Sequence, residues 1–473
     1  MVDSDGDSEV KSSGGAGPRA TVVSGITEDA IPALFAAASS APGGIAKALE
    51  EMRESQAALA ATPPLGIPGL GALRSPGLPE HATLHIAIEG VSILAARALQ
   101  DSRLVSTVVP TEMAVASGKI EPPGISEELR DKVSAAATAL QRAHLSVSER
   151  AAQRLVMRDR ATPQAASAAA RELAMGLAPS ATSTSVYLSA NARVLAAHCQ
   201  KLMSHPQPEV VAVGHAVLDA ARMATPDLFG GFAPSKMRSA AHAEIASAMA
   251  RLYAPPAEGA SATMVISQPV RLVRHDKDAL ERVVLALAYE GSDAAVHAFA
   301  LTSSLRAQKE TALQEVVRSL LRERVAGELT PRGFEASTMT FEIMADAATV
   351  HELLRHRTRA VSVQRFGCRL GFHTPEDLLD LGLADMYQDA MLAAQASWAE
   401  IEAEDPNAAE YTVPLGYRVR SLWTLDLRQL VYIVETRSTK DNPTRVRRIA
   451  HALYRTATAI LPWLRDIARA DLD

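Results

Sequence analysis

The sequence predicts an α+β protein made by tandem duplication, and three observations support this. Hydrophobic residues make up 48% of the chain but aromatic residues only 4%. Alanine carries much of that share, which favours helices because alanine has the highest intrinsic helix propensity. A few short alternating stretches, which predict strands, lie among the longer helical patterns. The order of strand and helix in the first half recurs in the second, so we expect two units of about half the chain each.

In the first half, residues 1–24 are rich in Ser, Gly and Asp and predict a disordered tail. Residues 27–60 predict two helices, and 63–81 hold too much Pro and Gly for a regular element. A strand is expected at 83–90, followed by a helix at 91–100. Further helical patterns occupy 126–160, 164–175, 189–204, 207–223 and 236–253.

The segment 253–262, YAPPAEGASA, is the best candidate for a linker. We therefore place the first unit at 25–255 and the second at 262–473. In the second unit, 270–275 and 338–346 predict strands, and a helix from 350 runs into the sequence RHR at 355–357. Other helical patterns cover 276–290, 292–302 and 308–326.

Two blocks of the first half match the second half without gaps. Residues 84–106 align with 340–362 at an offset of 256, which places Ser106 on Ser362. Residues 179–195 align with 414–430 at an offset of 235, which places Pro179 on Pro414. Identities are few, but the apolar pattern and the order of elements agree. This agreement indicates a duplication of one α+β unit.

Composition limits the classes of function. The formal net charge of -6 argues against binding a nucleic acid polymer, which requires a broad basic surface. Two cysteines are too few for a disulfide framework and fit a reducing compartment. No apolar run approaches the roughly 18 residues of a membrane span, and the N-terminus lacks the apolar core of a signal peptide. We expect a cytoplasmic protein that does not enter a membrane, and no metal-binding pattern is present.

A basic cluster stands out in this acidic chain. Arg355, His356 and Arg357 lie at a predicted helix end, where cations also suit the helix dipole. Arg428 and Arg437 lie on a second predicted helix, nine residues apart. Guanidinium groups are the usual partners of phosphate oxygens, so a phosphate-bearing ligand is the functional interpretation. A charged, solvated surface is the structural alternative.

These residues give the sequence a resemblance to a known family. RHR at 355–357 is followed by Ser362 and Arg365, and a proline is followed twelve residues later by Asn191-Ala192-Arg193 or by Asp426-Leu427-Arg428. This pattern resembles that of the flavin-dependent thymidylate synthases (ThyX), in a divergent, double-length branch with two copies of the fold. The resemblance implies that each unit has an antiparallel sheet with a large helical part.

The resemblance also implies ligands. It assigns FAD as the cofactor and a pyrimidine nucleotide as the substrate, with no protein nucleophile and so no catalytic side chain. The residues implied for FAD are Arg355, His356, Arg357, Asn191, Arg193 and Arg428. The residues implied for the nucleotide are Ser362, Gln364, Arg365 and Arg437.

The reaction implied is transfer of a methylene group from methylenetetrahydrofolate to C5 of dUMP, with hydride from reduced flavin and NADPH as the possible reductant. Because the family forms its sites between subunits, a homodimer of this tandem chain is expected. Where the family has Glu and Ser, this sequence has Val363 and Arg365, and the first unit has Leu99-Gln100-Asp101 in place of RHR. Two alternatives therefore stay open: a flavin enzyme with another acceptor, and a non-catalytic scaffold that binds flavin or nucleotide.

Overall fold

The computed structural model describes residues 78–109, 124–229, 268–293 and 295–472. It also describes the paired strands β1 (Val10–Ser13) and β2 (Ala20–Val23), with scattered residues at 31–51 and 240–253. The expected tail, the helices at 27–60 and the linker at 253–262 therefore lie largely outside the described residues. Among the residues that the structure describes, no helix is long and apolar enough to cross a membrane.

The first unit contains a three-stranded antiparallel sheet in the order β3-β5-β4. Its apolar residues form a core that includes Val186 and Leu188 of the central strand and Leu195 of the helix that follows. The strands are β3 (Thr83–Ser92), β4 (Ser106–Val108) and β5 (Ser183–Asn191). The helices packed with this sheet are α3 (Ile93–Gln100), α6 (Ala192–Leu202), α7 (Pro208–Ala224) and α8 (Pro226–Phe229).

The second unit contains a four-stranded antiparallel sheet in the order β6-β7-β9-β8. Phe341 and Trp423, which face each other across β7 and β9, are fully buried in its core. The strands are β6 (Val270–His275), β7 (Thr338–Asp346), β8 (Ala360–Val363) and β9 (Arg418–Asp426). The sheet's helices are α13 (Ala347–Leu353), α17 (Leu427–Arg437) and α18 (Thr444–Ile460). The predicted α+β fold with two tandem units is confirmed.

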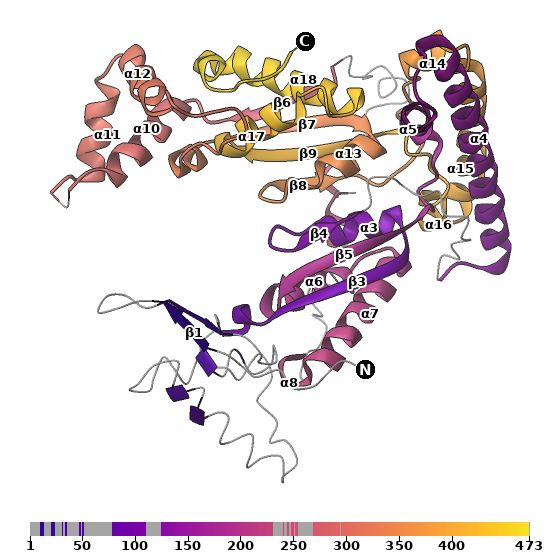
Figure 1. Ribbon diagram of the computed structural model, residues 1–473, viewed down its shortest axis with the longest axis horizontal. Coiled ribbons are helices and arrows are strands. Elements are labelled where there is room, and N and C mark those ends of the chain that lie inside the picture. The colour runs from indigo at the N-terminus through magenta and orange to yellow at the C-terminus, as the bar shows by residue number, and fades with distance from the viewer. Residues whose placement is uncertain are drawn as a thin grey trace.

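Helices of both units pack together beside the two sheets (Figure 1). Long α4 and α15 share one apolar core, to which Val147 and Tyr387 belong. The helices on this side are α4 (Glu127–Asp159), α5 (Pro163–Ala174), α14 (Glu376–Asp380), α15 (Ala384–Glu404) and α16 (Pro406–Glu410). Helices at the far end of the second unit are α10 (Ala279–Glu290), α11 (Ala298–Arg306) and α12 (Glu310–Leu320). Short 3₁₀ helices are η1 (Leu78–His81), η2 (Met175–Leu177), η3 (Arg332–Ala336) and η4 (Pro462–Asp466).

Residues matched by the sequence repeat touch each other where the units meet. Pro179 and Pro414, separated by the predicted offset of 235, form an antiparallel bridge. The Nε of Arg103 donates to the carbonyl oxygen of Arg359 at 3.1 Å, and these residues are separated by the other offset, 256. A contact between equivalent residues places both on an approximate two-fold axis. The duplication thus builds an internal pseudo-dimer.

Three sequence predictions need correction. The central strands β5 and β9 were not predicted, and the helix expected at 189–204 begins only at Ala192. Both strands carry polar residues that interrupt the alternation of apolar and polar positions. Each strand ends at a residue that caps the next helix, Asn191 for α6 and Asp426 for α17. The helix expected to run into RHR ends at Leu353, because the N–H groups of Arg355 and His356 bond to the carbonyls of Glu352 and Leu353, three residues back instead of four.

Candidate ligand-binding site between the two units

The RHR segment is positioned by a strand, a short helix and a tight turn. Strand β7 ends at Asp346, whose carboxylate accepts hydrogen bonds from the backbone N–H and hydroxyl of Thr349, both at 2.7 Å. This N-cap starts α13, which buries Val350 and Leu353 in the core. The chain then leaves the helix and enters β8 at Ala360. The three residues of RHR are therefore held at a fixed edge that faces the first unit.

Two arginines of RHR reach across to the first unit. The Nη1 of Arg357 donates to the carbonyl of Val105 at 2.8 Å and to the Oγ of Ser106 at 2.9 Å. The Nη2 of Arg355 makes a long contact of 3.5 Å with the carbonyl of Val109. Ser106 is the residue that the sequence repeat matches to Ser362. The RHR segment of the second unit therefore contacts the start of β4 in the first unit, the strand that the repeat matches to β8.

His356 and Arg437 form the centre of the cluster. The Nε of Arg437 donates to the Nε2 of His356 at 2.8 Å, and the ring of His356 packs edge-on against Tyr432. The Nη1 of Arg437 also pairs with Glu352 at 3.3 Å and with Asn442 at 3.1 Å. Two residues that the sequence nominated for different ligands, 81 positions apart, are therefore brought into direct contact.

Burial keeps His356 uncharged. Loss of hydration, together with the charges of Arg437 and Arg359, lowers the pKa of His356 to about 3. Because Nε2 accepts a hydrogen bond, the proton of the neutral ring must sit on Nδ1. Burial also lowers the pKa of His351 to about 4 and that of His198 to about 4. These three histidines take up protons far more readily in the unfolded chain than in the folded one.

Stability should therefore fall as the pH drops below about 6.5, the pKa of an unfolded histidine. Between that value and about 4 the unfolded chain binds more protons at these three sites, so the free energy of unfolding rises with pH. We expect a loss on the order of 2 kcal/mol per histidine between pH 7 and pH 5. Urea denaturation at both pH values measures it, and His198→Gln should reduce the difference by about one third. Equal stability at pH 5 and pH 7 would contradict this account.

The residues of the Asn-x-Arg motif cap and anchor helices. The Oδ1 of Asn191 accepts from the N–H of Val194 at 2.9 Å, and Asp426 caps α17 in the same way. Arg193 pairs with Glu80 at 2.7 Å, and Arg428 pairs with Glu335 at 2.7 Å. The two ion pairs occupy corresponding places in the two units.

These motif residues do not join the RHR cluster within one chain. Arg428 and Arg437 stand at opposite ends of α17. Nine residues of helix separate them by roughly 14 Å along the axis. In the first unit, Asn191 and Arg193 likewise lie at the start of α6. The repeat matches Leu202, at the other end of that helix, to Arg437. One chain therefore presents the proposed cofactor residues in three places: RHR, Arg428 at the start of α17, and Asn191 with Arg193 at the start of α6.

The segment after RHR forms another face of the junction. Ser362 and Val363, on β8, line a cavity of about 270 Å³ with Asp101 and Lys201 of the first unit. The backbone N–H of Gln364 donates to the carbonyl of Arg420, which extends the strand pairing by one residue. The side chains of Ser362 and Gln364 remain exposed.

Arg365 is held away from this cavity. Its Nη2 donates to the Oδ1 of Asn407 at 3.0 Å, and its Nε lies 3.9 Å from the carboxylate of Glu410. The same carboxylate accepts from the backbone N–H of Phe366 at 3.0 Å. These partners, which both belong to α16, hold the side chain of Arg365 against that helix.

The corresponding place in the first unit has a different polarity. By the repeat offsets, Gln100 stands for His356 and Leu202 for Arg437, and the Oε1 of Gln100 is buried without a partner among the described residues. Asp101, which stands for Arg357, pairs with Lys201 at 2.5 Å. An arginine is thus replaced by a carboxylate that is already neutralised. Only the second unit presents the cationic version of the site.

Two arginines of the junction, Arg97 and Arg359, were not assigned to a ligand from the sequence. The guanidinium of Arg97 lies 4.4 Å from the ring centroid of Phe366, and that of Arg359 lies 4.8 Å from the ring of Trp423. Burial lowers the pKa of Arg359 to about 10, a value at which the group still carries its charge near neutral pH. The repeat offset of 256 matches Arg103 to Arg359, so the alignment could have indicated that this pair lies where the two units meet. Among the described residues, no group of His, Cys, Asp and Glu has the arrangement of a metal site.

Comparison with known proteins identifies the family. The profile of the family described as "Thymidylate synthase complementing protein" matches this chain twice, at residues 33–227 and 271–463. The chain belongs to this family. The two matched segments contain the two sheets described above, so the resemblance inferred from RHR and from the repeat is confirmed.

Relatives of this chain carry names that state no reaction. A UPF0159 protein of Chlamydia pneumoniae is 26% identical over 402 residues, which cover 80% of this chain and 75% of that protein. A UPF0159 protein of Chlamydia muridarum is 30% identical over 187 residues, covering 39% and 35% of the two chains. A third, from Thermoplasma acidophilum, is 24% identical over 295 residues, covering 62% and 57%.

Proposed function

We propose that this protein is an FAD-dependent enzyme of the thymidylate synthase type that acts on a pyrimidine nucleotide. The observation that carries the proposal is the cluster of Arg355, His356, Arg357 and Arg437 at the junction of the units. Membership of the family supports the same reading. In the second unit alone, the cationic cluster coincides with the complete RHR motif.

The donor groups present fit a ligand with phosphates. Arg355 is exposed, and both cross-unit hydrogen bonds of Arg357 use a single nitrogen, Nη1. The Nε and Nη2 of Arg357 can therefore bind phosphate oxygens as a pair, and at Arg355 a phosphate would replace a long ion pair of 3.6 Å with Glu352. We assign Arg355, His356 and Arg357 to FAD, which when bound supplies the hydride of the reaction.

The neutral state of His356 defines its role. A histidine with its proton on Nδ1 donates one hydrogen bond and brings no charge into an already cationic cluster. Arg437 fixes the ring through Nε2 and keeps a second nitrogen on Glu352. We assign Arg437 to the nucleotide, together with Ser362, Gln364 and Arg365. We assign His356 the role of orienting hydrogen-bond donors and not that of transferring a proton.

The remaining motif residues point to a second copy of the chain. Arg428 stands at the start of α17, and Asn191 and Arg193 stand at the start of α6; no hydrogen bond or ion pair among the described residues joins any of them to RHR. A second copy of the chain would bring its own residues of this motif to the flavin site. We therefore propose a homodimer, in which the four units take the places of four subunits, with methylenetetrahydrofolate and NADPH as co-substrates.

A second candidate is a flavin enzyme with a different acceptor. The observation in its favour is the segment after RHR, where Val361 and Val363 line the cavity of about 270 Å³. Arg365, meanwhile, is engaged by Asn407 and Glu410. A site of this polarity differs from one that offers a carboxylate to a uracil ring, and hydrogen-bonding sites discriminate strongly on such groups.

The direct test is turnover by the full chain. The protein is supplied with FAD, NADPH, methylenetetrahydrofolate and dUMP, and thymidylate is measured by chromatography. We expect thymidylate from the wild type and a loss of roughly tenfold or more in kcat/KM for Arg437→Ala, which removes charged hydrogen bonds. Arg455→Ala, an exposed change on α18, is the control. NADPH oxidation without thymidylate would favour the second candidate, and no flavin-dependent reaction would reject both.

A further inference from the structure

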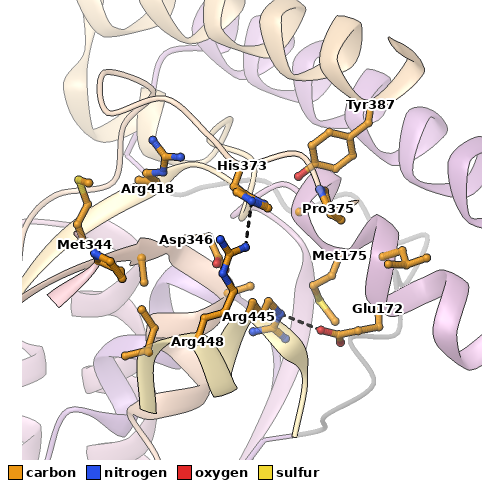
Figure 2. Close-up of a pocket in the computed structure, with 17 residues that line it drawn as sticks. Glu172, Met175, Met344, Asp346, His373, Pro375, Tyr387, Arg418, Arg445 and Arg448 are labelled. Atoms are coloured by element: carbon orange, nitrogen blue, oxygen red, sulfur yellow. Dashed lines mark hydrogen bonds and ion pairs between the residues drawn. The ribbon is translucent and has the colours of Figure 1, made fainter. Parts of the chain in front are cut away.

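A second cavity, of about 350 Å³, lies at the other end of α13 (Figure 2). Both units build its wall, because Glu172 and Met175 come from the first unit and Asp346 and Arg418 from the second. Asp346 precedes α13, whereas RHR follows that helix. Seven residues of helix, roughly 10 Å, therefore separate this cavity from the RHR cluster. None of the residues that we assign to FAD or to the nucleotide lines it.

Three arginines face this cavity, and one of them has no partner. Arg445 pairs with Glu172 at 2.8 Å. Arg448, at the exposed mouth, donates to the Nε2 of His373 at 3.0 Å. Within the described part of the chain, the guanidinium of Arg418 has no hydrogen bond and no ion pair. Figure 2 shows Arg448 below His373 and Arg418 above and to its left.

The charges in the cavity do not balance. The three arginines face two carboxylates, those of Glu172 and Asp346. His373 accepts a hydrogen bond from Arg448, and burial together with that arginine lowers its pKa, so it adds no charge near neutral pH. Among the residues that line the cavity, one positive charge is left over; Glu376 and Glu352, which lie near His373 and Arg445, do not line it. A ligand with a single negative charge would compensate it.

A buried hydroxyl points to the same ligand. Tyr387 lines the cavity and is only 1% exposed, yet its hydroxyl has no hydrogen-bond partner among the described residues. Burial raises the pKa of Tyr387, so the group stays protonated and can donate. Space for it comes from Gly176 and Gly416, where an added Cβ would lie 2.1 Å and 2.5 Å from the hydroxyl oxygen. The hydroxyl is therefore a hydrogen-bond donor that a ligand in the cavity can use.

The pseudo-symmetry of the chain relates this cavity to a corresponding place in the other half, where larger side chains occupy the space. The offset of 235 matches Gly176 to Tyr411, whose hydroxyl donates to Glu209 at 2.8 Å. Glu209 in turn occupies the place of Arg445, since α7 and α18 begin 236 residues apart. In the other half, therefore, a phenol and a carboxylate fill the space themselves. Here a glycine and an arginine replace them.

We propose that this cavity binds a small organic acid through one carboxylate, held by Arg418 and Arg448 and by the Tyr387 hydroxyl. The bidentate geometry of a guanidinium suits a carboxylate, and the single excess charge matches one such group. Apolar side chains on the wall, among them Met175, Met344 and Ile449, would cover the body of the ligand. The proposal does not depend on the flavin or nucleotide assignments.

Benzoate serves as the probe, titrated into the full chain in a calorimeter without flavin or nucleotide. We expect one site per chain. Tyr387→Phe and Arg418→Gln should each weaken binding roughly tenfold or more, because each removes a hydrogen bond to a charged group. Arg455→Gln, exposed on the same helix as Arg448, should leave binding unchanged. Because the Tyr387 hydroxyl has no protein partner, Tyr387→Phe should melt at the temperature of the wild type.

Three results would overturn the proposal. The first is the absence of benzoate binding to the wild type. The second is equal affinity in the wild type, Tyr387→Phe and Arg418→Gln, which would place the probe elsewhere. The third is tighter binding of phenyl phosphate than of benzoate, since a dianion exceeds the single charge that the cavity leaves over. None of these outcomes bears on the flavin site, which is measured separately.

Discussion

Replacement of Arg324 by Met is expected to destabilise the protein by about 3–5 kcal/mol, the largest loss among the single changes considered. Arg324 follows α12, and its side chain is 5% exposed, while that of its partner Glu435 on α17 is fully buried. Arg324 also donates to the carbonyl of Ile467 at 2.9 Å. Glu435 accepts further bonds from the N–H groups of Gly327 and Arg469. Removing the guanidinium leaves a charge buried without its counter-ion.

Urea denaturation followed by circular dichroism measures this loss. Arg318→Met is the matched control, because Arg318 pairs with Asp466 on the surface with its side chain 48% exposed. Exposed pairs contribute about 0–1 kcal/mol. If Arg324→Met cost no more than Arg318→Met, the buried pair would not hold α12, α17 and the C-terminal segment together.

Gly176→Ala is expected to cost about 1–3 kcal/mol, the usual range for overpacking a filled interior. Gly176 lies where the two units cross, and its backbone oxygen accepts the N–H of Gly416 at 2.8 Å. An added Cβ would lie 2.1 Å from the hydroxyl oxygen of Tyr387 and 3.2 Å from the Cα of Gly416. The phenol is buried on α15, so the ring has little room to move.

A double-mutant cycle isolates the cause of that loss. Tyr387→Phe removes the oxygen that an added Cβ would meet first, so Gly176→Ala should cost less in a Tyr387→Phe background. The free energy of unfolding of the four proteins gives the coupling. A coupling of zero would show that the clash does not arise at the hydroxyl and would remove the basis for placing this group in the cavity wall.

The fold was predictable where hydrophobic periodicity is strong. Strand β7 was predicted over 338–346 with the bounds that it has, because its apolar residues alternate clearly. The central strands β5 and β9 escaped prediction. Their polar side chains interrupt the apolar alternation, and several find partners on the neighbouring strand, as Thr424 does on Thr340 and Arg420 on Glu342, which a local sequence pattern cannot show. Hydrophobic periodicity predicts single helices and strands, whereas the sequence repeat predicts that they form two similar units.

The candidate site was predictable residue by residue but not as an arrangement. RHR and Arg437 stand out as basic residues near helix ends, and the contact of His356 with Arg437 follows from how α13 and α17 pack. The bond from Arg357 to Ser106 joins residues 251 positions apart, and no local pattern specifies it. Asn191, which the resemblance assigns to the flavin, and Asp426 both cap helices, a role that the sequence analysis did not predict for either.

Equilibrium titration of the purified chain with FAD tests the central claim most directly, with flavin fluorescence as the signal. The account predicts saturable binding by the wild type. The variant Arg355→Ala/Arg357→Ala should bind roughly a hundredfold more weakly, since two charged donors to phosphate are lost. Arg455→Ala/Arg465→Ala, which removes two exposed arginines elsewhere in the second unit, should bind as the wild type does. Equal affinity in all three proteins, or no binding by the wild type, would contradict the assignment of RHR to the flavin.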